Sequence, residues 1–350
     1  MRLPVVWSDD CLRHDPGGAM FVGVRTPEDE VPARLEAIRA ALAEADARFV
    51  PAERHADEAL LAVHDAALLD YLRGAWDEWQ RSGLPADPGQ DRVVAYIFPH
   101  RGLGARRAPA AAWARAGWFA YDTMTVVGPG TWAAARAAVD AALTAADLVV
   151  AGEPAAYACV RPPGHHACRT CFGGSCYLNN AAIAAESLRA RLGGPVAVVD
   201  IDAHQANGTQ ELFYERADVV LASVHVDPAA GWFPHFLGFA DETGSGAGAG
   251  ANLNLPLPPG AGDEEWLAAV AEAARRAAGA RALVVSLGVD AAAGDPESPL
   301  QVTAAAYREA GRRLGELGLP TVLVQEGGYD LATLGPLVRE TLLGFEAALG

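Results

Sequence analysis

Two aspartates and a histidine follow an apolar run that has the composition of a buried strand. The run spans residues 196–199, and Asp200, Asp202 and His204 come after it at alternating positions. Because alternate side chains of an extended chain point the same way, the three groups begin on one side of the backbone. Carboxylates and an imidazole are ligands that suit a divalent metal such as zinc. The spacing therefore indicates a metal site at the end of a strand.

Three further clusters of polar residues also follow apolar runs. Open α/β sheets bind ligands outside the carboxyl ends of their strands, so we expect all the clusters to meet at one edge of a sheet. The further clusters are 161–167 with His165 and His166, 287–297 with Asp290, and 325–330 with Tyr329.

The elements that must position these clusters alternate along the chain. Short apolar runs, typical of strands in parallel sheets, are separated by alanine-rich helical patterns, which predicts a doubly wound α/β sheet. The expected strands include residues 5–7, 156–160, 196–199, 219–221, 283–285 and 321–324. The expected helices include residues 32–45, 58–79, 131–146, 180–192, 264–278, 303–317 and 332–349.

Three long segments, residues 8–31, 82–107 and 226–250, interrupt this alternation. Loops of this length in a compact domain usually form functional rims or bind partners. We therefore expect one domain over residues 1–350 that carries three loop insertions.

The composition is that of an acidic globular protein. Of its 350 residues, 51% are hydrophobic and 20% are charged, and the net charge is −17. Such a chain lacks the basic surface that nucleic-acid binding needs, whereas it attracts a cationic small molecule. The first residues lack the apolar middle of a signal peptide, and no uncharged apolar run approaches the length of a membrane span. We expect a cytoplasmic protein that binds neither nucleic acid nor membranes.

The five cysteines are too few and too irregularly spaced for a disulfide framework. Cys168 and Cys171 form a C-x-x-C pair, but no second pair exists in the sequence to complete a zinc knuckle. We interpret this pair as incidental to the chemistry, with a redox or loop-bracing role as the alternative.

With its four clusters in this order, the chain resembles the zinc-dependent deacetylases of the arginase-deacetylase fold, and among them most the acetylpolyamine amidohydrolases. A single HH or D-x-H motif would be unspecific, but four in one order are specific. The resemblance covers nearly the whole chain. It implies a single-domain, three-layer α/β/α fold with a mostly parallel central sheet. Supporting stretches are residues 128–132, 177–182 and 237–242.

The resemblance implies that Asp202, His204 and Asp290 bind one zinc ion per chain. Three protein ligands leave a position open for water and a substrate carbonyl, as in catalytic zinc sites. Taken alone, Asp290 could instead cap a turn after its strand. The resemblance also implies a structural potassium ion, at Asp200, Asp202, His204, Ser223 and Val224.

The catalytic groups are assigned by the same resemblance. His166 corresponds to the general base, which later acts as general acid, and His165 gives electrostatic support. Asp200 corresponds to the carboxylate that orients His165, and Asn207 to the polar partner of His166. Tyr329, after two glycines, corresponds to a hydroxyl donor that stabilises an oxyanion. Outside this setting, a histidine pair or a lone tyrosine is more often a loop or packing residue.

Several positions bear on the substrate. Ser175, after Gly174, stands where most relatives have an aromatic wall of the substrate tunnel, and Phe233 corresponds to the opposite wall. Serine leaves that wall short, so we expect a wider substrate or a side chain from elsewhere in the gap. Glu297 matches a glutamate that favours cationic polyamines in one branch of the family, although it could equally be a solvated residue at a helix entry. Gln205 replaces a second histidine of the family, which alters packing but not the ligand set.

The leading hypothesis is a zinc amidohydrolase that removes an acetyl or similar short acyl group from an amine, with acetylpolyamines as the first substrate class. Acetyl-lysine in proteins and an acylated biosynthetic intermediate remain open as substrates. A manganese ureohydrolase is disfavoured, because Ala206 and Ala292 stand where its further aspartates would bind a second metal. An inactive binding module is the last alternative. Segments 8–31 and 82–107 resemble insertions that build a dimer, so we expect a homodimer.

Overall fold

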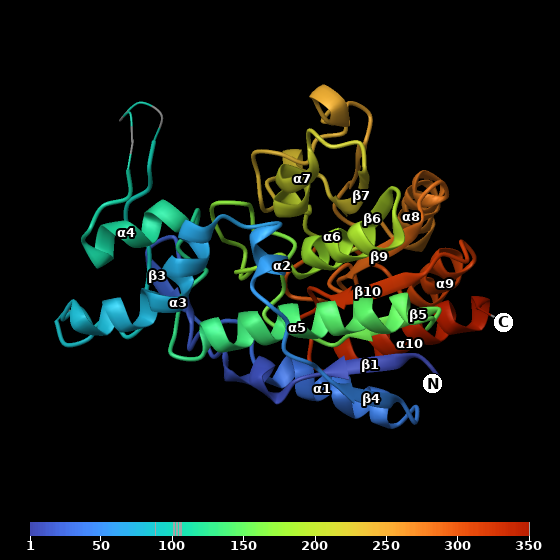
Figure 1. Ribbon diagram of the computed structural model, residues 1–350, viewed down its shortest axis with the longest axis horizontal. Helices are drawn as coiled ribbons and strands as arrows, with labels where there is room; N and C mark the ends of the chain where they lie inside the picture. The colour runs from blue at the N-terminus through green and yellow to red at the C-terminus, as the bar shows by residue number, and fades with distance from the viewer. Residues whose placement is uncertain (88, 101, 103, 105–106, 350) are drawn as a thin grey trace.

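Parallel strands form the central sheet of the computed structural model, which describes residues 1–87, 89–100, 102, 104 and 107–349 (Figure 1). The eight strands of this sheet are β1 (Pro4–Trp7), β4 (Arg48–Pro51), β5 (Ala155–Ala158), β6 (Val196–Asp200), β7 (Val219–Val226), β8 (Asn252–Leu257), β9 (Ala282–Leu287) and β10 (Thr321–Gln325). Their spatial order is β4-β1-β5-β10-β9-β6-β7-β8, and every neighbouring pair is parallel.

Helices cover both faces of the sheet and complete three layers (Figure 1). One face carries α1 (Ala33–Ala43), α8 (Asp263–Ala277), α9 (Ala304–Gly315) and α10 (Leu334–Ala348). The other carries α5 (Thr131–Val150) and α6 (Asn180–Leu192), with the short α2 (Glu58–Leu61) and α7 (Asn207–Phe213) beside α6. Because both faces are covered, β6 and β9 are buried along their whole length, which explains their apolar sequences. The predicted α/β fold is confirmed.

The helix expected over residues 58–79 is wrong, because the chain forms two helices, α2 and α3 (Ala66–Arg81). Between them, Asp65 has an extended backbone and the side chain of His64 is buried. Nδ1 of His64 lies 2.9 Å from the carbonyl oxygen of Cys168, and Nε2 accepts the N–H of Asn179 at 2.9 Å. The helix is interrupted here, and His64 makes these tertiary hydrogen bonds at the interruption. No local sequence pattern predicts them.

The sequence patterns did not predict some of the strands and helices. The edge strands β4 and β8 are only partly buried, so their sequences lack the continuous apolar run of the central strands. The helices α4 (Ala112–Phe119) and α7 are short, so too few residues carry a helical period.

The three long segments contain short elements of their own. Residues 8–31 include the 3-10 helix η1 (Asp9–Arg13) and an antiparallel hairpin of β2 (Ala19–Phe21) and β3 (Val24–Thr26). Residues 226–250 include η3 (Pro228–Ala230) and η4 (Gly246–Gly248). Within the 82–107 segment, residues 88, 101, 103 and 105–106 lie outside the described residues.

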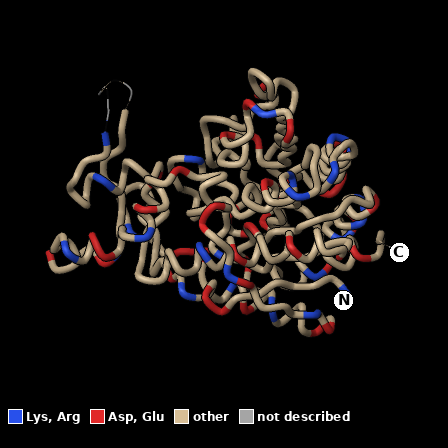
Figure 2. Tube along the Cα trace, in the orientation of Figure 1, with Lys and Arg blue, Asp and Glu red and all other residues tan. Residues whose placement is uncertain are grey.

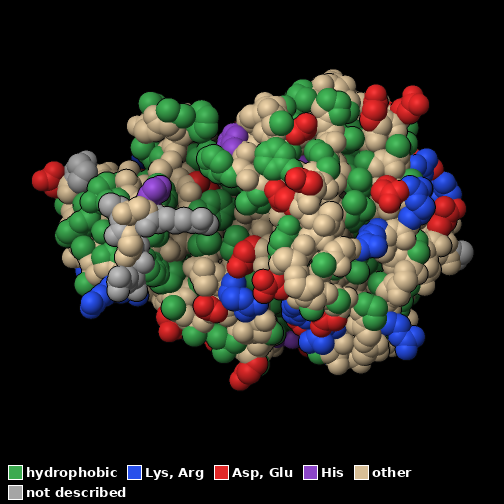
Figure 3. Space-filling view, turned by 90° about the horizontal axis from the view of Figure 1, so that it is seen from above, with side chains coloured by type: hydrophobic (Ala, Val, Ile, Leu, Met, Phe, Trp, Pro, Cys, Tyr) green, Lys and Arg blue, Asp and Glu red, His purple; other side chains and the backbone are tan. Residues whose placement is uncertain are grey.

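The helices α3 and α4 lie beyond one end of the sheet, away from both chain termini (Figure 1). Hydrophobic side chains gather on this part of the surface (Figure 3), and Tyr96, Ile97 and Trp113 are exposed there. Within the described ranges, no helix is both long and apolar enough to cross a membrane.

Candidate active site

The four polar clusters of the sequence meet at one edge of the sheet. β5, β10, β9 and β6 are neighbours in that order, and each runs into one cluster at its carboxyl end. This is the edge at which open α/β sheets bind ligands. The clusters supply His165 and His166 after β5, Tyr329 after β10, Asp290 after β9, and Asp202 and His204 after β6.

Asp202, His204 and Asp290 form a buried cluster of potential ligand atoms. One atom of each residue lies within 4.8 Å of the atoms from the other two. Nδ1 of His204 is 3.2 Å from Oδ1 of Asp202 and 3.0 Å from Oδ2 of Asp290. The structure thus brings together the three side chains predicted to bind a metal.

Backbone groups hold the other oxygens of the two carboxylates. The N–H of Gly327 donates to Oδ2 of Asp202 at 2.7 Å, and the N–H of Ala203 donates to Oδ1 of Asp290 at 2.7 Å. A Cβ on Gly327 would lie 2.3 Å from Oδ2 of Asp290, and one on Gly288 would lie 2.1 Å from Oδ2 of Asp202. Glycine at both positions therefore lets the backbone approach the carboxylates and fix their direction.

The charges of this cluster fit a divalent cation. Burial opposes ionisation of Asp202, but His165 and His204 outweigh it and lower the pKa of the carboxyl group. Burial also opposes protonation of His204, while Asp202 and Asp290 raise the pKa of the ring. Burial and the charge of Asp202 raise the pKa of Asp290 to about 7. Two buried carboxylates that converge on one imidazole nitrogen require a compensating positive charge, and zinc binds this donor set.

His165 and His166 lie side by side, with their ring centroids 4.0 Å apart. Nδ1 of His165 is 3.0 Å from Oδ2 of Asp200, and Nδ1 of His166 is 2.5 Å from Oδ1 of Asn207. An oxygen acceptor at Nδ1 places a ring proton there and fixes the orientation of the ring. Both histidines therefore have the partners that the sequence predicts.

The two rings differ in charge. Burial opposes protonation of His165, but Asp202 and Asp200 outweigh it and raise its pKa to about 10. Burial and the neighbouring rings of His165 and His204 lower the pKa of His166 well below its usual value. A neutral His166 can accept a proton at neutral pH, next to a positively charged neighbour.

Tyr329 lies on a loop that Arg34 of α1 supports. The guanidinium carbon of Arg34 is 4.7 Å from the centroid of the Tyr329 ring. The same guanidinium donates to the carbonyl oxygens of Gly328 and Glu326, both at 2.6 Å. The N–H of Tyr329 donates to Oδ2 of Asp295 at 2.8 Å. These contacts hold the loop that carries the phenol.

A pocket of about 480 Å³ opens onto this cluster, a size suited to a small molecule. It is lined by His166, His204 and Tyr329, and by the predicted substrate residues Gly174, Ser175, Phe233 and Glu297. The rest of its wall comes mostly from two of the predicted insertions, through Ala19, Phe21, Thr26, Pro27, Glu28 and Asp29 and through Gly231, Trp232 and His235, with Met124.

The loop at Gly174 and Ser175 has a left-handed backbone, with φ of +57° and +60°. A Cβ on Gly174 would lie 2.4 Å from Cδ2 of His166, so glycine lets the loop pack against the ring. The N–H of Ser175 donates to Oγ1 of Thr125 at 2.8 Å. Phe233 packs edge-on against His166 with a centroid distance of 4.9 Å. One wall is therefore aromatic, while the serine side is short.

The residues predicted to bind potassium lie where β6 and β7 pair. Asp200 is opposite Ser223 in the ladder, and Val224 follows in β7. Oγ of Ser223 lies 2.9 Å from Nδ1 of His225.

The departures from the family pattern are accommodated by packing. Gln205 is buried and donates through Nε2 to Oε1 of Gln210 at 2.9 Å. Ala206 and Ala292 are also buried. Their methyl groups offer no oxygen at the two positions where a second metal would need ligands.

Sequence reasoning missed buried charges that support the site. Glu30 bonds Arg34 at 2.9 Å and Arg161 at 2.7 Å, and all three side chains are buried. Oε2 of Glu326 accepts the N–H groups of Gly164 at 2.7 Å and His165 at 3.1 Å. The i,i+4 spacing of Glu30 and Arg34 was an available signal, whereas the contact with Arg161 is visible only in the fold.

Comparisons with known proteins agree with this geometry. Residues 28–344 match the histone deacetylase domain family. The chain is 41% identical to the acetylpolyamine amidohydrolase of Mycoplana ramosa, over 97% of this chain and 98% of that protein. It is 40% identical to acetylpolyamine amidohydrolase 1 of Pseudomonas aeruginosa, over 98% and 99% of the two chains. The crystal structure of acetylpolyamine aminohydrolase from Burkholderia pseudomallei superposes with a TM-score of 0.94 at 38% identity, covering 99% and 100% of the two chains.

Proposed function

The chain belongs to the histone deacetylase domain family and is a deacetylase, and we propose that it uses zinc to hydrolyse acetylated polyamines or related small acylated amines. The observation that carries this proposal is the cluster of Asp202, His204 and Asp290 beside a pocket that also reaches His166 and Tyr329. The relatives named as acetylpolyamine amidohydrolases support the substrate class.

Asp202, His204 and Asp290 are the residues that would hold the metal. A bound zinc ion supplies a Lewis acid that polarises an amide carbonyl and makes a water molecule more acidic. The chain's own contribution is to fix two of the three donors through backbone N–H groups, and to bury the cluster so that its charges act at full strength.

Three side chains of the site have different roles in the proposed reaction. His166, neutral because of burial and neighbouring rings, takes a proton from the attacking water at Nε2 and returns it to the leaving amine. His165 stays charged between Asp200 and Asp202 and stabilises negative charge that develops nearby. The Tyr329 hydroxyl, whose pKa is raised mainly by burial, stays protonated and donates to the oxygen that becomes negative.

Carboxylates at the pocket wall support a cationic substrate. Glu28, Asp29 and Glu297 all line the pocket. Burial is the main cause of the raised pKa of Glu28, which is about 7. Burial is also the main cause that raises the pKa of Glu297. An ammonium group of a polyamine would pair with these carboxylates and favour their charged forms, and the face of Trp232 offers a further contact for a cation.

The test of the substrate class compares an N-acetylated polyamine with an acetyl-lysine peptide on the zinc-loaded enzyme. We expect kcat/KM to be at least about tenfold higher for the polyamine, because it brings an ammonium group to the acidic wall, whereas the acetylated lysine side chain is neutral. The Glu297→Gln variant should lose part of this preference while retaining turnover of the peptide. Equal or better hydrolysis of the peptide would contradict the polyamine assignment and favour protein deacetylation.

A Tyr329→Phe comparison tests the chemistry separately from the substrate. Loss of the hydroxyl should lower kcat about 100- to 1000-fold, as for other oxyanion donors, with little change in KM. An unchanged kcat would remove Tyr329 from the catalytic groups.

Four further parts of the proposal rest on indirect support. A potassium ion at Asp200, Asp202, His204, Ser223 and Val224 is supported by the pairing of β6 with β7. A homodimer is supported by the exposed Tyr96, Ile97 and Trp113, and light scattering that found only monomer would reject it.

One domain over residues 1–350 is supported by the continuous buried core. A cytoplasmic protein that binds neither nucleic acid nor membranes is supported by the net charge of −17 and by the mixture of both signs along the described trace (Figure 2).

A further inference from the structure

The Cys168–Cys171 pair lies in the loop that follows His166. The N–H of Cys168 donates to the carbonyl oxygen of Cys171 at 2.9 Å. This bond holds the backbones of the two residues next to each other, as a disulfide between them requires. The thiol of Cys168 donates to the carbonyl oxygen of His166 at 3.7 Å, and each of the two thiols shifts the pKa of the other. Both thiols are free.

These two cysteines differ from the other three in access. Cys11, Cys159 and Cys176 are fully buried, whereas Cys168 and Cys171 are partly exposed. Burial raises the pKa of Cys11 to about 12 and also raises the pKa of Cys159 and Cys176. A reactive cysteine needs both access and thiolate character, so the other three thiols are inert.

The pair is chemically asymmetric. The neighbouring Cys168 side chain lowers the pKa of Cys171, whereas the Cys171 side chain together with burial raises the pKa of Cys168. Cys171 is therefore the first to become a thiolate, while Cys168 keeps its proton. This division of roles is the one that a nucleophilic thiol and a resolving thiol require.

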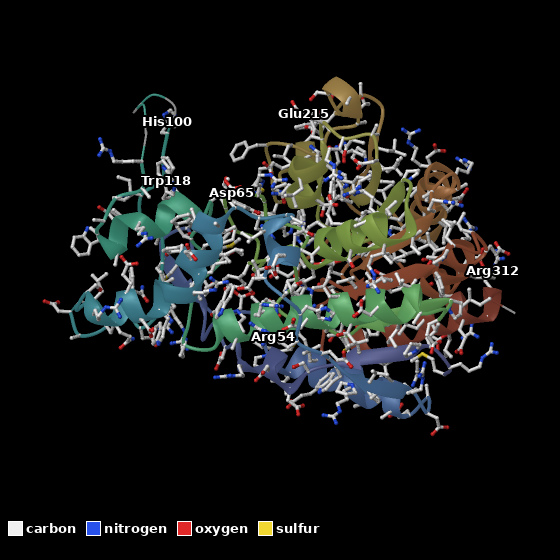
Figure 4. The ribbon with its side chains drawn as sticks, viewed as in Figure 1. Arg54, Asp65, His100, Trp118, Glu215 and Arg312 are labelled. Atoms are coloured by element: carbon white, nitrogen blue, oxygen red, sulfur yellow. The ribbon has the colours of Figure 1, made fainter. Side chains whose placement is uncertain are left out.

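Three hydrogen bonds to two other segments fix the loop. Nδ1 of His64 donates to the carbonyl oxygen of Cys168 at 2.9 Å. The N–H of Asp65, labelled in Figure 4, donates to the carbonyl oxygen of Arg169 at 2.9 Å, and the N–H of Arg169 donates to Oε2 of Glu211 at 2.9 Å. A disulfide across so short a loop removes little chain entropy, so it would add little stability. The arrangement suits a reversible reaction better than a permanent cross-link.

We propose that Cys168 and Cys171 form a thiol–disulfide exchange site that reacts with small disulfides such as oxidised glutathione. The Cys171 thiolate attacks one sulfur of the small disulfide, so that a mixed disulfide forms and one small thiolate leaves. Cys168 then loses its proton, and its sulfur attacks the Cys171 sulfur, which forms the Cys168–Cys171 bond and releases the second small thiolate. The two leaving groups take up two protons, so one small disulfide is reduced to two thiols as the two cysteines are oxidised.

The test incubates the reduced full-length protein in buffers with graded ratios of reduced to oxidised glutathione, followed by alkylation and mass spectrometry. We expect the peptide that contains Cys168 and Cys171 to lose two hydrogens, while Cys11, Cys159 and Cys176 remain alkylatable after unfolding. Loss of all five thiols together, or an internal bond to one of the buried three, would overturn the proposal.

Matched single variants test the order of attack. Cys168→Ser should stop at a glutathionyl adduct on Cys171, and Cys171→Ser should react at least about tenfold more slowly, because the remaining thiol stays protonated. Equal rates for the two variants would overturn the assignment of Cys171 as the nucleophile. Thermal unfolding of both variants verifies that they are folded, since neither thiol contributes to the core described above.

Discussion

Nδ1 of His166 lies 2.5 Å from Oδ1 of Asn207, so an amide and not a carboxylate holds the ring assigned as general base. The neighbouring ring of His165 has the carboxylate of Asp200 at 3.0 Å instead. Because a carboxylate favours the protonated imidazole and an amide does so much less, this difference separates the pKa values of the two rings in the direction that acid–base catalysis needs.

Asn207→Asp should therefore raise the pKa of His166. A base with a raised pKa becomes active only at higher pH, so the acidic limb of the kcat/KM profile should move upward by about one unit or more. The profile with an acetylated amine between pH 5 and 9 measures this shift. Asn207→Ser is the matched control, since it places no charge near the ring, and a profile identical to that of Asn207→Asp would contradict the argument.

Asp290→Ala should remove stoichiometric zinc. The change leaves two ligand side chains, so we expect loss of bound metal and a fall of more than about 100-fold in kcat/KM, since even changes behind the ligands cost 10- to 100-fold at metal sites. Elemental analysis of the purified variant and circular dichroism measure metal and fold independently. Asp227→Ala, at an exposed cap of η3, should retain full metal content.

Ser175→Phe should narrow the pocket from its short side. Ser175 and the aromatic Phe233 both line the pocket, so a phenyl ring at position 175 would occupy space that a wide acyl group or amine needs. We expect kcat/KM to fall at least about tenfold for a branched acyl amide and much less for the acetyl amide. Ser175→Ala tests the loss of the hydroxyl alone, and equal losses on both substrates would mean that the site does not use this space.

His64 should make the folded state sensitive to acid. Its Nε2 accepts the N–H of Asn179, so the buried ring is neutral with its proton on Nδ1, and burial is the main cause that lowers its pKa from 6.5 to about 4. Below pH 6.5 the ring takes up a proton in the unfolded chain but not in the folded chain. The contribution of this ring to the free energy of unfolding is therefore fully present above pH 6.5 and declines as the pH falls towards 4.

The loss should approach about 3 kcal/mol once the pH is below the folded pKa. Urea unfolding of the wild type and of His64→Gln at several pH values in this window measures it, and the variant should show a shallower decline. His14 and His225, whose pKa values burial also lowers to about 4, remain in both proteins and cancel in the comparison. Parallel curves for the two proteins would show that His64 is not a source of the pH dependence.

That the candidate catalytic groups lie together was predictable, because each of them belongs to a short segment with a recognisable pattern. Polar side chains directly after apolar runs are uncommon in a core, and strand alternation fixed the side on which they start. The supports of these groups were not predictable, because they come from distant segments. Arg34 of α1 binds the loop that carries Tyr329. No pattern near either residue in the sequence predicts this contact.

The same distinction explains the errors in secondary structure. Buried central strands were recognised, since both of their faces need apolar residues, while the half-exposed edge strands β4 and β8 carry a weaker pattern. The break between α2 and α3 depends on tertiary bonds of His64 to Cys168 and Asn179. A helical period cannot report such a break when the residues around it remain helix-compatible.

The hydrogen bond from Gly327 to Asp202 joins the second residue after β10 to the second residue after β6, across the intervening β9. β10 is the last strand to be synthesised, yet it occupies the middle of the sheet between β5 and β9. A nascent chain in which β10 is not yet made therefore lacks a central strand of the sheet and the N–H group that holds Oδ2 of Asp202. The candidate metal site is therefore complete only after β10 and Gly327 have been synthesised.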